Sequence, residues 1–240
     1  MEHCSSVVLE CWRIGSRVLK YWKHGVLGST VSVAKRAVAG EHCLIKLCLY
    51  DIMLKQTASL CKLESINLSF TVVSDGGLRE LSGLTSLKSL NLDARQITDA
   101  GLAALTSLTG LTHLDLFGAR ITDSGTSHLR NLRNLRSLEI CGGGLTDAGV
   151  KNIKDLSSLS LLNLSQNCNL TDKTLEMISG LTGLISLNVS NSRVTSAGLR
   201  HLKPLKNLRS LTLEACKVTA NDIRRLQSAG LPNLVNFRPE

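Results

Sequence analysis

Aromatic side chains are scarce in this chain of 240 residues, where tryptophan, tyrosine and phenylalanine together make up 3%. A core with so few rings must be filled by aliphatic side chains, and leucine dominates among them. All tryptophans and tyrosines precede residue 60, and the first of only three prolines is Pro204. The composition therefore indicates a repetitive, leucine-based architecture that follows a segment of different character.

Other absences limit where the protein works. No run of 18 apolar residues occurs, so the sequence predicts no membrane span. The first residues lack the charged start, apolar run and cleavage site of a secretory signal. The eight cysteines form no Cys-x-x-Cys pair, and no histidine lies at zinc-ligand spacing from two of them. We therefore expect free thiols in a reducing compartment, cytoplasmic or nuclear, and no metal or other cofactor.

From residue 60 onward the sequence repeats itself. Each copy carries aliphatic residues at spacings of three, three and two, as in Leu84, Leu87, Leu90 and Leu92. Seven copies and a final half-copy follow one another at start-to-start spacings of 24 to 26 residues. The pair at spacing two places both side chains on one face of a short strand. One such unit cannot bury its apolar face alone, so neighbouring copies must stack.

The second half of each copy repeats as well. Ile97-Thr-Asp-Ala-Gly-Leu102 is matched by Ile121-Thr-Asp-Ser-Gly125 and Leu145-Thr-Asp-Ala-Gly-Val150, and more loosely by the remaining copies. Within this block the threonine offers an N-cap and the aspartate a first-turn acid, both favourable where a helix begins. Residues 60–240 are therefore predicted to form an α/β solenoid, with a curved parallel sheet on the concave face and short helices on the convex face.

These two blocks resemble the leucine-rich-repeat family over residues 60–240. The Ile-Thr-Asp-x-Gly-Leu block is similar to the intracellular subclass of F-box/LRR-repeat proteins, above all those of plants. The resemblance implies a leucine-rich-repeat solenoid that recognises substrates for a ubiquitin ligase, with a Skp1-type adaptor as a further partner. The alternative is a scaffold or sensing protein without a ligase link, as in intracellular defence signalling. The Leu-Pro opening and patterned helical core of an F-box are not visible, so both readings stay open.

Residues 1–59 are interpreted as a divergent N-terminal extension, partly helical or poorly ordered. Apolar residues fall near one helical face: Val8, Trp12, Val18, Leu19 and Trp22. Such a helix could plug the first repeat, or contact a membrane surface or a partner. A weak organelle-targeting peptide is a third interpretation, against which Glu2 and Glu10 argue. The repeats begin abruptly at Leu60, as in a shortened form of a longer array.

The outward-facing positions of the predicted strands form three ladders across the sheet. These ladders hold four acids and no lysine or arginine, although the net charge of the chain is +9. A nucleic-acid-binding face would be basic, so we expect no nucleic acid there. Basic residues gather instead on the approach from helix to strand, where they are either solvated charge or a second surface: Arg130, Arg133, Arg136, Arg200, Lys203, Lys206 and Arg209.

The centre of the concave face combines an aromatic ring with carboxylates. Phe117 is the only aromatic on the ladders, and a ring of this kind is a typical binding anchor. Asp115 is expected beside Glu139, and such a like-charge pair favours a basic or mixed partner. The candidate partner-binding residues, unless they cluster by chance, are Asp93, His113, Asp115, Phe117, Glu139 and Cys141. An open face excludes water poorly, so we expect protein binding and not catalysis.

Overall fold

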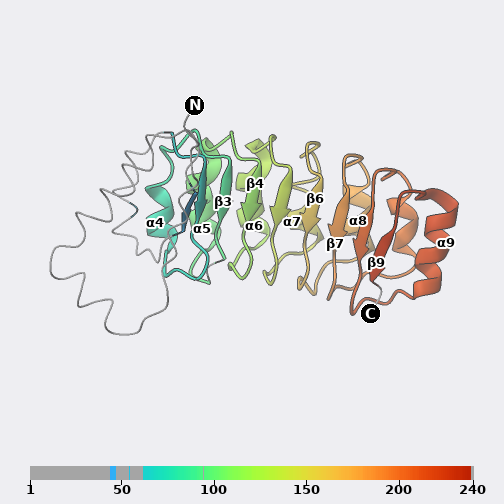
Figure 1. Ribbon diagram of the computed structural model, residues 1–240. Coiled ribbons are helices and arrows are strands. Elements are labelled where there is room, and N and C mark those ends of the chain that lie inside the picture. Colours follow the sequence, from blue (N-terminus) through green and yellow to red (C-terminus); the bar gives the residue numbers. More distant parts are fainter. Residues whose placement is uncertain (1–43, 47–53, 55–61, 94, 239–240) are drawn as a thin grey trace, which may run out of the picture.

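The computed structural model describes residues 44–46, 54, 62–93 and 95–238. Within these residues the strands form one parallel sheet in which each pairs with the next along the chain. The nine strands, each of three residues, are β1 (Leu44–Lys46), β2 (Ser65–Asn67), β3 (Ser89–Asn91), β4 (His113–Asp115), β5 (Ser137–Glu139), β6 (Leu161–Asn163), β7 (Ser186–Asn188), β8 (Ser210–Thr212) and β9 (Asn236–Arg238). The repeats follow one another in a single row (Figure 1).

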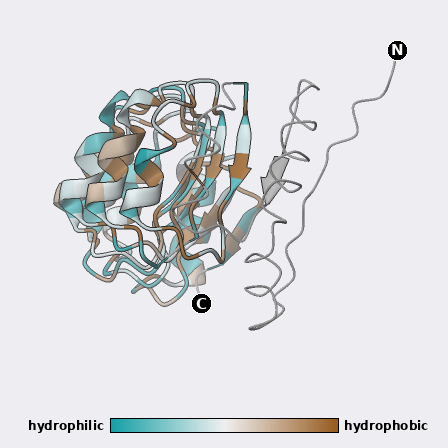
Figure 2. Cartoon of the chain, turned by 90° about the vertical axis from the view of Figure 1, so that its left-hand side faces the viewer, coloured by the Kyte–Doolittle hydropathy of each residue, from teal (hydrophilic) through white to brown (hydrophobic). Residues whose placement is uncertain are grey.

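Short helices cover one side of this sheet, as Figure 2 shows in a view along the row of repeats. The α-helices are α4 (Asp75–Arg79), α5 (Asp99–Leu102), α6 (Asp123–Thr126), α7 (Asp147–Val150), α8 (Asp172–Ile178) and α9 (Ala220–Gly230). Three 3-10 helices continue or replace them: η1 (Ala103–Ser107), η2 (Ser127–Asn131) and η3 (Gly198–Leu202). The predicted α/β solenoid, with its sheet on the concave face and helices on the convex face, is confirmed.

The register of the sheet follows the leucine pattern. Leu90 lies opposite Leu114, and Leu114 lies opposite Leu138, so the strands are centred on the residues that the repeat predicts. All three side chains are at most 1% exposed, because the pleat turns every second residue into the core. Between sheet and helices the other repeated aliphatic positions are buried in the same way, which gives one continuous core along the row of repeats.

The sheet contains one strand in front of the expected first repeat. Strand β1 pairs with β2, with Leu44 opposite Ser65. A strand from the C-terminal half-copy, β9, extends the other end, where Phe237 takes the place of the usual leucine opposite Leu211. The predicted helical or poorly ordered character of residues 1–59 falls almost entirely outside the described residues and stays a prediction.

In the described residues a serine or threonine of the repeated block caps each α-helix, as predicted, and in most repeats the block also joins its helix to the neighbouring repeat. Thr146 precedes α7, and its Oγ1 accepts a hydrogen bond from the N–H of Ala148. In addition, the N–H and the Oγ1 of Thr146 donate to the two carboxylate oxygens of Asp123, in the preceding repeat, at 2.8 and 2.6 Å. Five successive pairs share this arrangement: Asp75–Thr98, Asp99–Thr122, Asp123–Thr146, Asp147–Thr171 and Asp172–Thr195. We call this series the Thr–Asp ladder.

The ladder explains the glycine of the same block. A Cβ on Gly125 would lie 2.9 Å from Cγ of Asp99, so a side chain there would push the carboxylate away from Thr122. The ladder ends where Ser196 occupies the aspartate position. Ser196 donates from Oγ to Asp222 at 2.6 Å, and Asp222 also closes the capping box at the start of α9. The sequence pattern identifies the cap of each described α-helix, but it does not predict the hydrogen bonds between the threonine of one repeat and the aspartate of the preceding one.

Candidate binding site on the concave face

Strands β4 and β5 place the central side chains as the ladders predict. His113 is exposed, Leu114 is buried and Asp115 is half-buried, so the outward and inward positions alternate along β4. Asp115 lies opposite Glu139 in the parallel register, and Glu139 is also half-buried. The predicted like-charge pair is therefore present on adjacent strands.

Among the described residues, the side chains that donate hydrogen bonds to this pair of carboxylates are neutral amides. Asn91 donates from Nδ2 to Asp115 at 2.8 Å, and Asn163 donates from Nδ2 to Glu139 at 2.9 Å. In the part of the chain that the structure describes, the recorded ion pairs are Lys88–Glu64 and Arg238–Glu214, and they involve neither residue. The amides orient the carboxylates without cancelling their charge, which leaves negative charge on the face. Asn91 and Asn163 occupy the same strand position as Asp115 and Glu139. Their role as hydrogen-bond donors to these carboxylates could therefore have been predicted from the sequence.

Asp93 extends the negative centre towards β3. Its pKa is raised above the usual value, chiefly because burial disfavours the charged form and also because Asp115 is near; the guanidinium of Arg95 opposes the shift. A raised pKa means that the carboxylate is electrostatically destabilised in the folded protein. A cation brought to this spot would relieve the repulsion between Asp93 and Asp115.

Phe117 follows β4 and presents its ring to solvent. The side chain is 42% exposed, and the backbone N–H donates to Oδ1 of Asp115 at 2.9 Å. Gly118, the next residue, has a φ of +70°, which turns the chain away from the face. His113 lies on the same strand, with Nδ1 2.8 Å from Oγ1 of Thr112. The ring and the carboxylates thus occur together, as the sequence predicts.

Cys141 does not belong to this exposed surface, and that prediction is wrong. Its side chain is 0% exposed, and Sγ lies 3.8 Å from the carbonyl oxygen of Asn163. Burial raises the pKa of the thiol to about 11. The hydrogen bond from Ser165 lowers this pKa, and the nearby carboxylates of Glu139 and Asp115 raise it by smaller amounts. The period-two count fails because the chain turns after Glu139, so alternation no longer decides which way a side chain points. Ser165 and Ser190, at equivalent positions, are likewise buried.

Part of the basic helix-to-strand region is organised by hydrogen bonds. Arg130 donates from Nε and Nη2 to Oδ1 of Asn152, which in turn donates to the buried hydroxyl of Thr126 at 3.0 Å. Arg133 and Arg136 are exposed. Among the described residues no group of three or more histidine, cysteine or acidic side chains is arranged to hold a metal ion. No helix of that part of the chain is long and apolar enough to cross a membrane.

Comparisons with known proteins agree with this geometry. One family model, described as leucine rich repeat, matches residues 133–194, and a second with the same description matches residues 59–82 and 108–129. No curated protein sequence gives a significant match.

Two solved structures with a similar fold are internalins of Listeria monocytogenes. The internalin inlF is 27% identical over 81% of this chain and 60% of its own, with a TM-score of 0.60. This chain therefore spans less than two thirds of the length of that structure. Internalin C2 is 22% identical over 78% of this chain and 74% of its own, with a TM-score of 0.61, and its likeness concerns the fold alone.

Proposed function

We propose that this leucine-rich-repeat protein binds another protein through the centre of its concave face. Leucine-rich-repeat proteins in general mediate contacts between proteins. The observation that carries the proposal is the position of Phe117, which is 42% exposed next to Asp115, a carboxylate without an ion pair in the described residues. Exposed rings surrounded by polar groups are typical hot spots, worth about 2 kcal/mol or more when a partner covers them.

The partner presents basic or mixed side chains to this site. Asp93, Asp115 and Glu139 gather negative charge over three neighbouring strands, each about 4.8 Å from the next. Because the pKa of Asp93 is raised by burial and by Asp115, a lysine or arginine placed here gains from the existing repulsion. Cys141 lies beneath the surface, so the proposed contact residues are Asp93, His113, Asp115, Phe117 and Glu139.

Binding, and not catalysis, is the activity that we assign to this face. His113 and Asp115 lie on one strand, but the strand belongs to an open surface where solvent has free access to the ring and the carboxylates. Acid–base chemistry depends on water being excluded around the reacting atoms. An open face suits recognition of a large partner better than turnover of a small substrate.

As the cellular setting we propose substrate recognition for a ubiquitin ligase, in the cytoplasm or the nucleus. The support is the resemblance of the Ile97-Thr-Asp-Ala-Gly-Leu102 block to F-box/LRR-repeat proteins of plant type. Cys141, Cys168 and Cys216 are free thiols, which agrees with a reducing compartment. A scaffold or sensing protein without a ligase link remains the second candidate, because residues 60–240 would serve it equally well.

Affinity purification of the tagged full chain tests both the proposed cellular setting and the proposed binding site. Recovery of a Skp1-type adaptor and a cullin supports the ligase setting, whereas other proteins without them support the scaffold. Parallel purifications with Phe117→Ala and with Val235→Ala test the site, because Val235 is an exposed aliphatic residue (68%) that precedes β9, five strands from β4. A partner that is lost with Phe117→Ala and kept with Val235→Ala docks on the concave centre. Equal recovery with both variants contradicts the site.

A further inference from the structure

A second surface lies at the opposite end of the strands, where each strand begins. The residue that precedes each strand is polar in most repeats: Glu64, Lys88, Thr112, Arg136, Ser160 and Arg209. In front of β7 and β9 the same position holds Ile185 and Val235, whose side chains are 45% and 68% exposed. Exposed aliphatic side chains at a position that is otherwise polar point to a surface that a partner covers.

These residues are direct neighbours in space. The N–H of Arg209 donates to the carbonyl of Ile185 at 2.8 Å, and the N–H of Val235 donates to the carbonyl of Arg209 at 3.0 Å. Arg209 therefore lies between the two aliphatic side chains, at one strand spacing from each. Leu161, half-buried at the first position of β6 and in register with Ser186, adds apolar surface one strand before Ile185. We call Leu161, Ile185, Arg209 and Val235 the apolar–basic edge.

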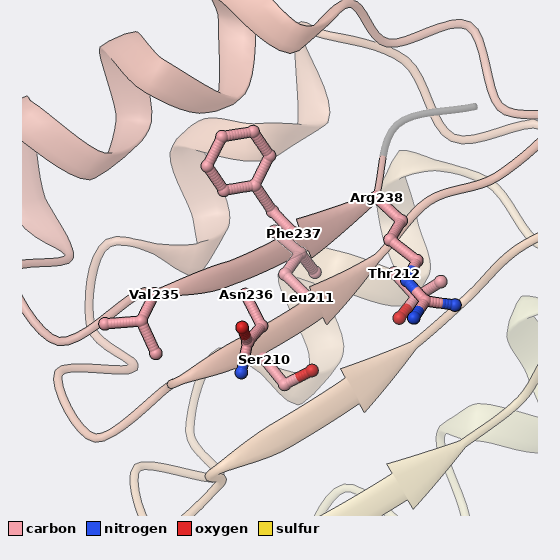
Figure 3. A pocket seen from close by; sticks show the side chains of 7 residues that line it. All are labelled: Ser210, Leu211, Thr212, Val235, Asn236, Phe237 and Arg238. Atoms are coloured by element: carbon pink, nitrogen blue, oxygen red, sulfur yellow. The ribbon is translucent and has the colours of Figure 1, made fainter.

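An open cavity adjoins this edge over β8 and β9. It has a volume of about 610 Å³ and is lined by Ser210, Leu211, Thr212, Val235, Asn236, Phe237 and Arg238 (Figure 3). Figure 3 shows that Val235 lies at one end of this lining and Arg238 at the other. The apolar–basic edge therefore borders a recess, in which side chains of a partner find room.

The charge at the edge is positive. Arg209 forms no ion pair with a carboxylate of the described residues, and Arg136, two strands before Ile185, forms none either. Glu214 lies two residues after β8 and five beyond Arg209, and its Oε1 is 4.0 Å from Nη1 of Arg238. On the helix-to-strand side Asp155 is exposed and lies five residues before Ser160. A partner with carboxylates between apolar side chains complements this pattern.

We propose that the apolar–basic edge docks an acidic amphipathic helix of a partner protein, laid across strands β5 to β9. One helical turn rises about 5.4 Å, close to the strand spacing of about 4.8 Å, so one face of a helix meets one strand per turn. An extended segment repeats its side chains on one face every ~7 Å, which matches neither one strand spacing nor two. The edge thus fits a helix better than an added strand.

The register of the edge defines the sequence pattern of that helix. If an apolar residue at position i covers Ile185, a residue at i+7 reaches Val235, two strands away, after a rise of about 10.5 Å. A glutamate or aspartate at i+3 or i+4 then meets Arg209, and an apolar residue at i−4 or i−3 meets Leu161. An acid near i−7 falls opposite Arg136. This pattern differs from the basic segment that the concave centre is proposed to bind.

A synthetic peptide with this pattern tests the inference. The probe is an acetylated and amidated alanine-based helix of about 15 residues, with leucine and glutamate at the spacings given above. Its affinity for the full chain is measured by fluorescence anisotropy at low salt, beside a scrambled peptide and one with a central proline. Arg209→Glu and Ile185→Ser are compared with Arg193→Glu and Val72→Ser, which change an exposed arginine and an equally exposed (45%) valine elsewhere.

The expected result is saturable binding that falls about tenfold or more with Arg209→Glu and with Ile185→Ser. Arg193→Glu, Val72→Ser and Phe117→Ala leave the affinity unchanged, and the scrambled and proline peptides bind at least tenfold more weakly. Absence of binding below roughly 1 mM, or equal binding of the scrambled peptide, overturns the proposal. Loss of affinity with Phe117→Ala assigns the peptide to the concave centre and overturns it as well.

Discussion

The Thr–Asp ladder makes a quantitative prediction about stability. Substitution of Asp123 by alanine removes two acceptors, those for the N–H of Thr146 at 2.8 Å and for its Oγ1 at 2.6 Å. Hydrogen bonds to charged groups contribute about 1.5 to 3 kcal/mol each, and Asp123 is only half-buried, so we expect the free energy of unfolding to fall by about 2 to 4 kcal/mol. In a chain of this length this corresponds to a decrease in Tm of roughly 4 to 16 °C.

A double-mutant cycle separates the energy of the Asp123–Thr146 interaction from other destabilising effects of each substitution. Thr146→Val removes the hydroxyl that donates to Asp123 and that accepts from the N–H of Ala148. If the contact between repeats carries the stability, the double variant is less destabilised than the sum of the single variants, by about 1 to 2 kcal/mol. Asp155→Ala is the control, because this exposed acid lies in a loop, and its removal changes stability by at most about 0.5 kcal/mol.

Urea denaturation followed by circular dichroism measures the unchanged protein and the four variants under one set of conditions. The reasoning is refuted if Asp123→Ala destabilises no more than Asp155→Ala. It is also refuted if the effects of Asp123→Ala and Thr146→Val add within about 0.3 kcal/mol, because independent sites behave in that way. A reduced m-value in the Asp123 variant, with a broader transition, would show instead that the row of repeats no longer unfolds as one unit.

Three further outcomes follow from the structure. Phe117→Ala should leave stability within about 0.5 kcal/mol and weaken partner binding roughly tenfold, and Asp115→Lys should weaken it further and alter its salt dependence; calorimetry with the recovered partner checks both, and unchanged affinities would move the site elsewhere. Burial alone would raise the pKa of Asp147, but hydrogen bonds from Thr171 and Thr174 outweigh it and hold the pKa below the usual 3.8. The contribution of the Asp147 carboxylate to the free energy of unfolding is therefore complete above about pH 4 and is lost as the pH falls through its lower folded pKa. Asp147→Asn should thus make the free energy of unfolding less dependent on pH in acid. Iodoacetamide at pH 8 should modify exposed Cys168 well before Cys141, whose pKa is about 11, and equal rates in peptide mass mapping would contradict the burial of Cys141.

The repeat made most of the fold predictable. A leucine spacing that recurs every 24 to 26 residues fixes the strand centres, because only one register buries every copy at once. Strand β1 lies at the start of the apolar stretch from Leu44 to Leu54, which is compatible with a decayed repeat or cap, but this stretch lacks the leucine pattern from which the repeats were counted. The helix-initiating role of Thr146 was also visible, since an N-cap is a local feature. Its bond to Asp123 was not, because the contact depends on how closely one repeat stacks on the next.

In the candidate site, too, some features could be predicted from the sequence and others could not. His113, Asp115 and Glu139 lie within strands, where alternation predicts their direction, and all three face outward as expected. Phe117 and Cys141 come two residues after their strands, where the chain already turns, and there the period-two rule predicts one correctly and the other wrongly. The exposure of Ile185 could have been predicted from the sequence. Ile185 directly precedes its strand, and other repeats place a charged residue at this position, namely Lys88, Arg136 or Arg209.

One of the three ladders consists of the residues two positions after each strand, and its partial burial changes where a partner can bind. Cys141, Ser165 and Ser190 are at most 8% exposed, so from β5 to β7 these positions offer no side chain to a partner. Phe117 is the last residue of that ladder to be exposed before this covered stretch, and Asp93 precedes it on the next strand towards the N-terminus. A partner at the concave centre therefore meets side chains above β3 and β4 and mostly small or covered positions beyond β5. Ile185 and Val235 lie at the other end of later strands, so this part of the second site is separated from the concave centre both along the row of repeats and across the sheet. The two sites come nearest to each other at β5, where Glu139 belongs to the concave centre and Arg136, directly before the strand, faces the proposed helix.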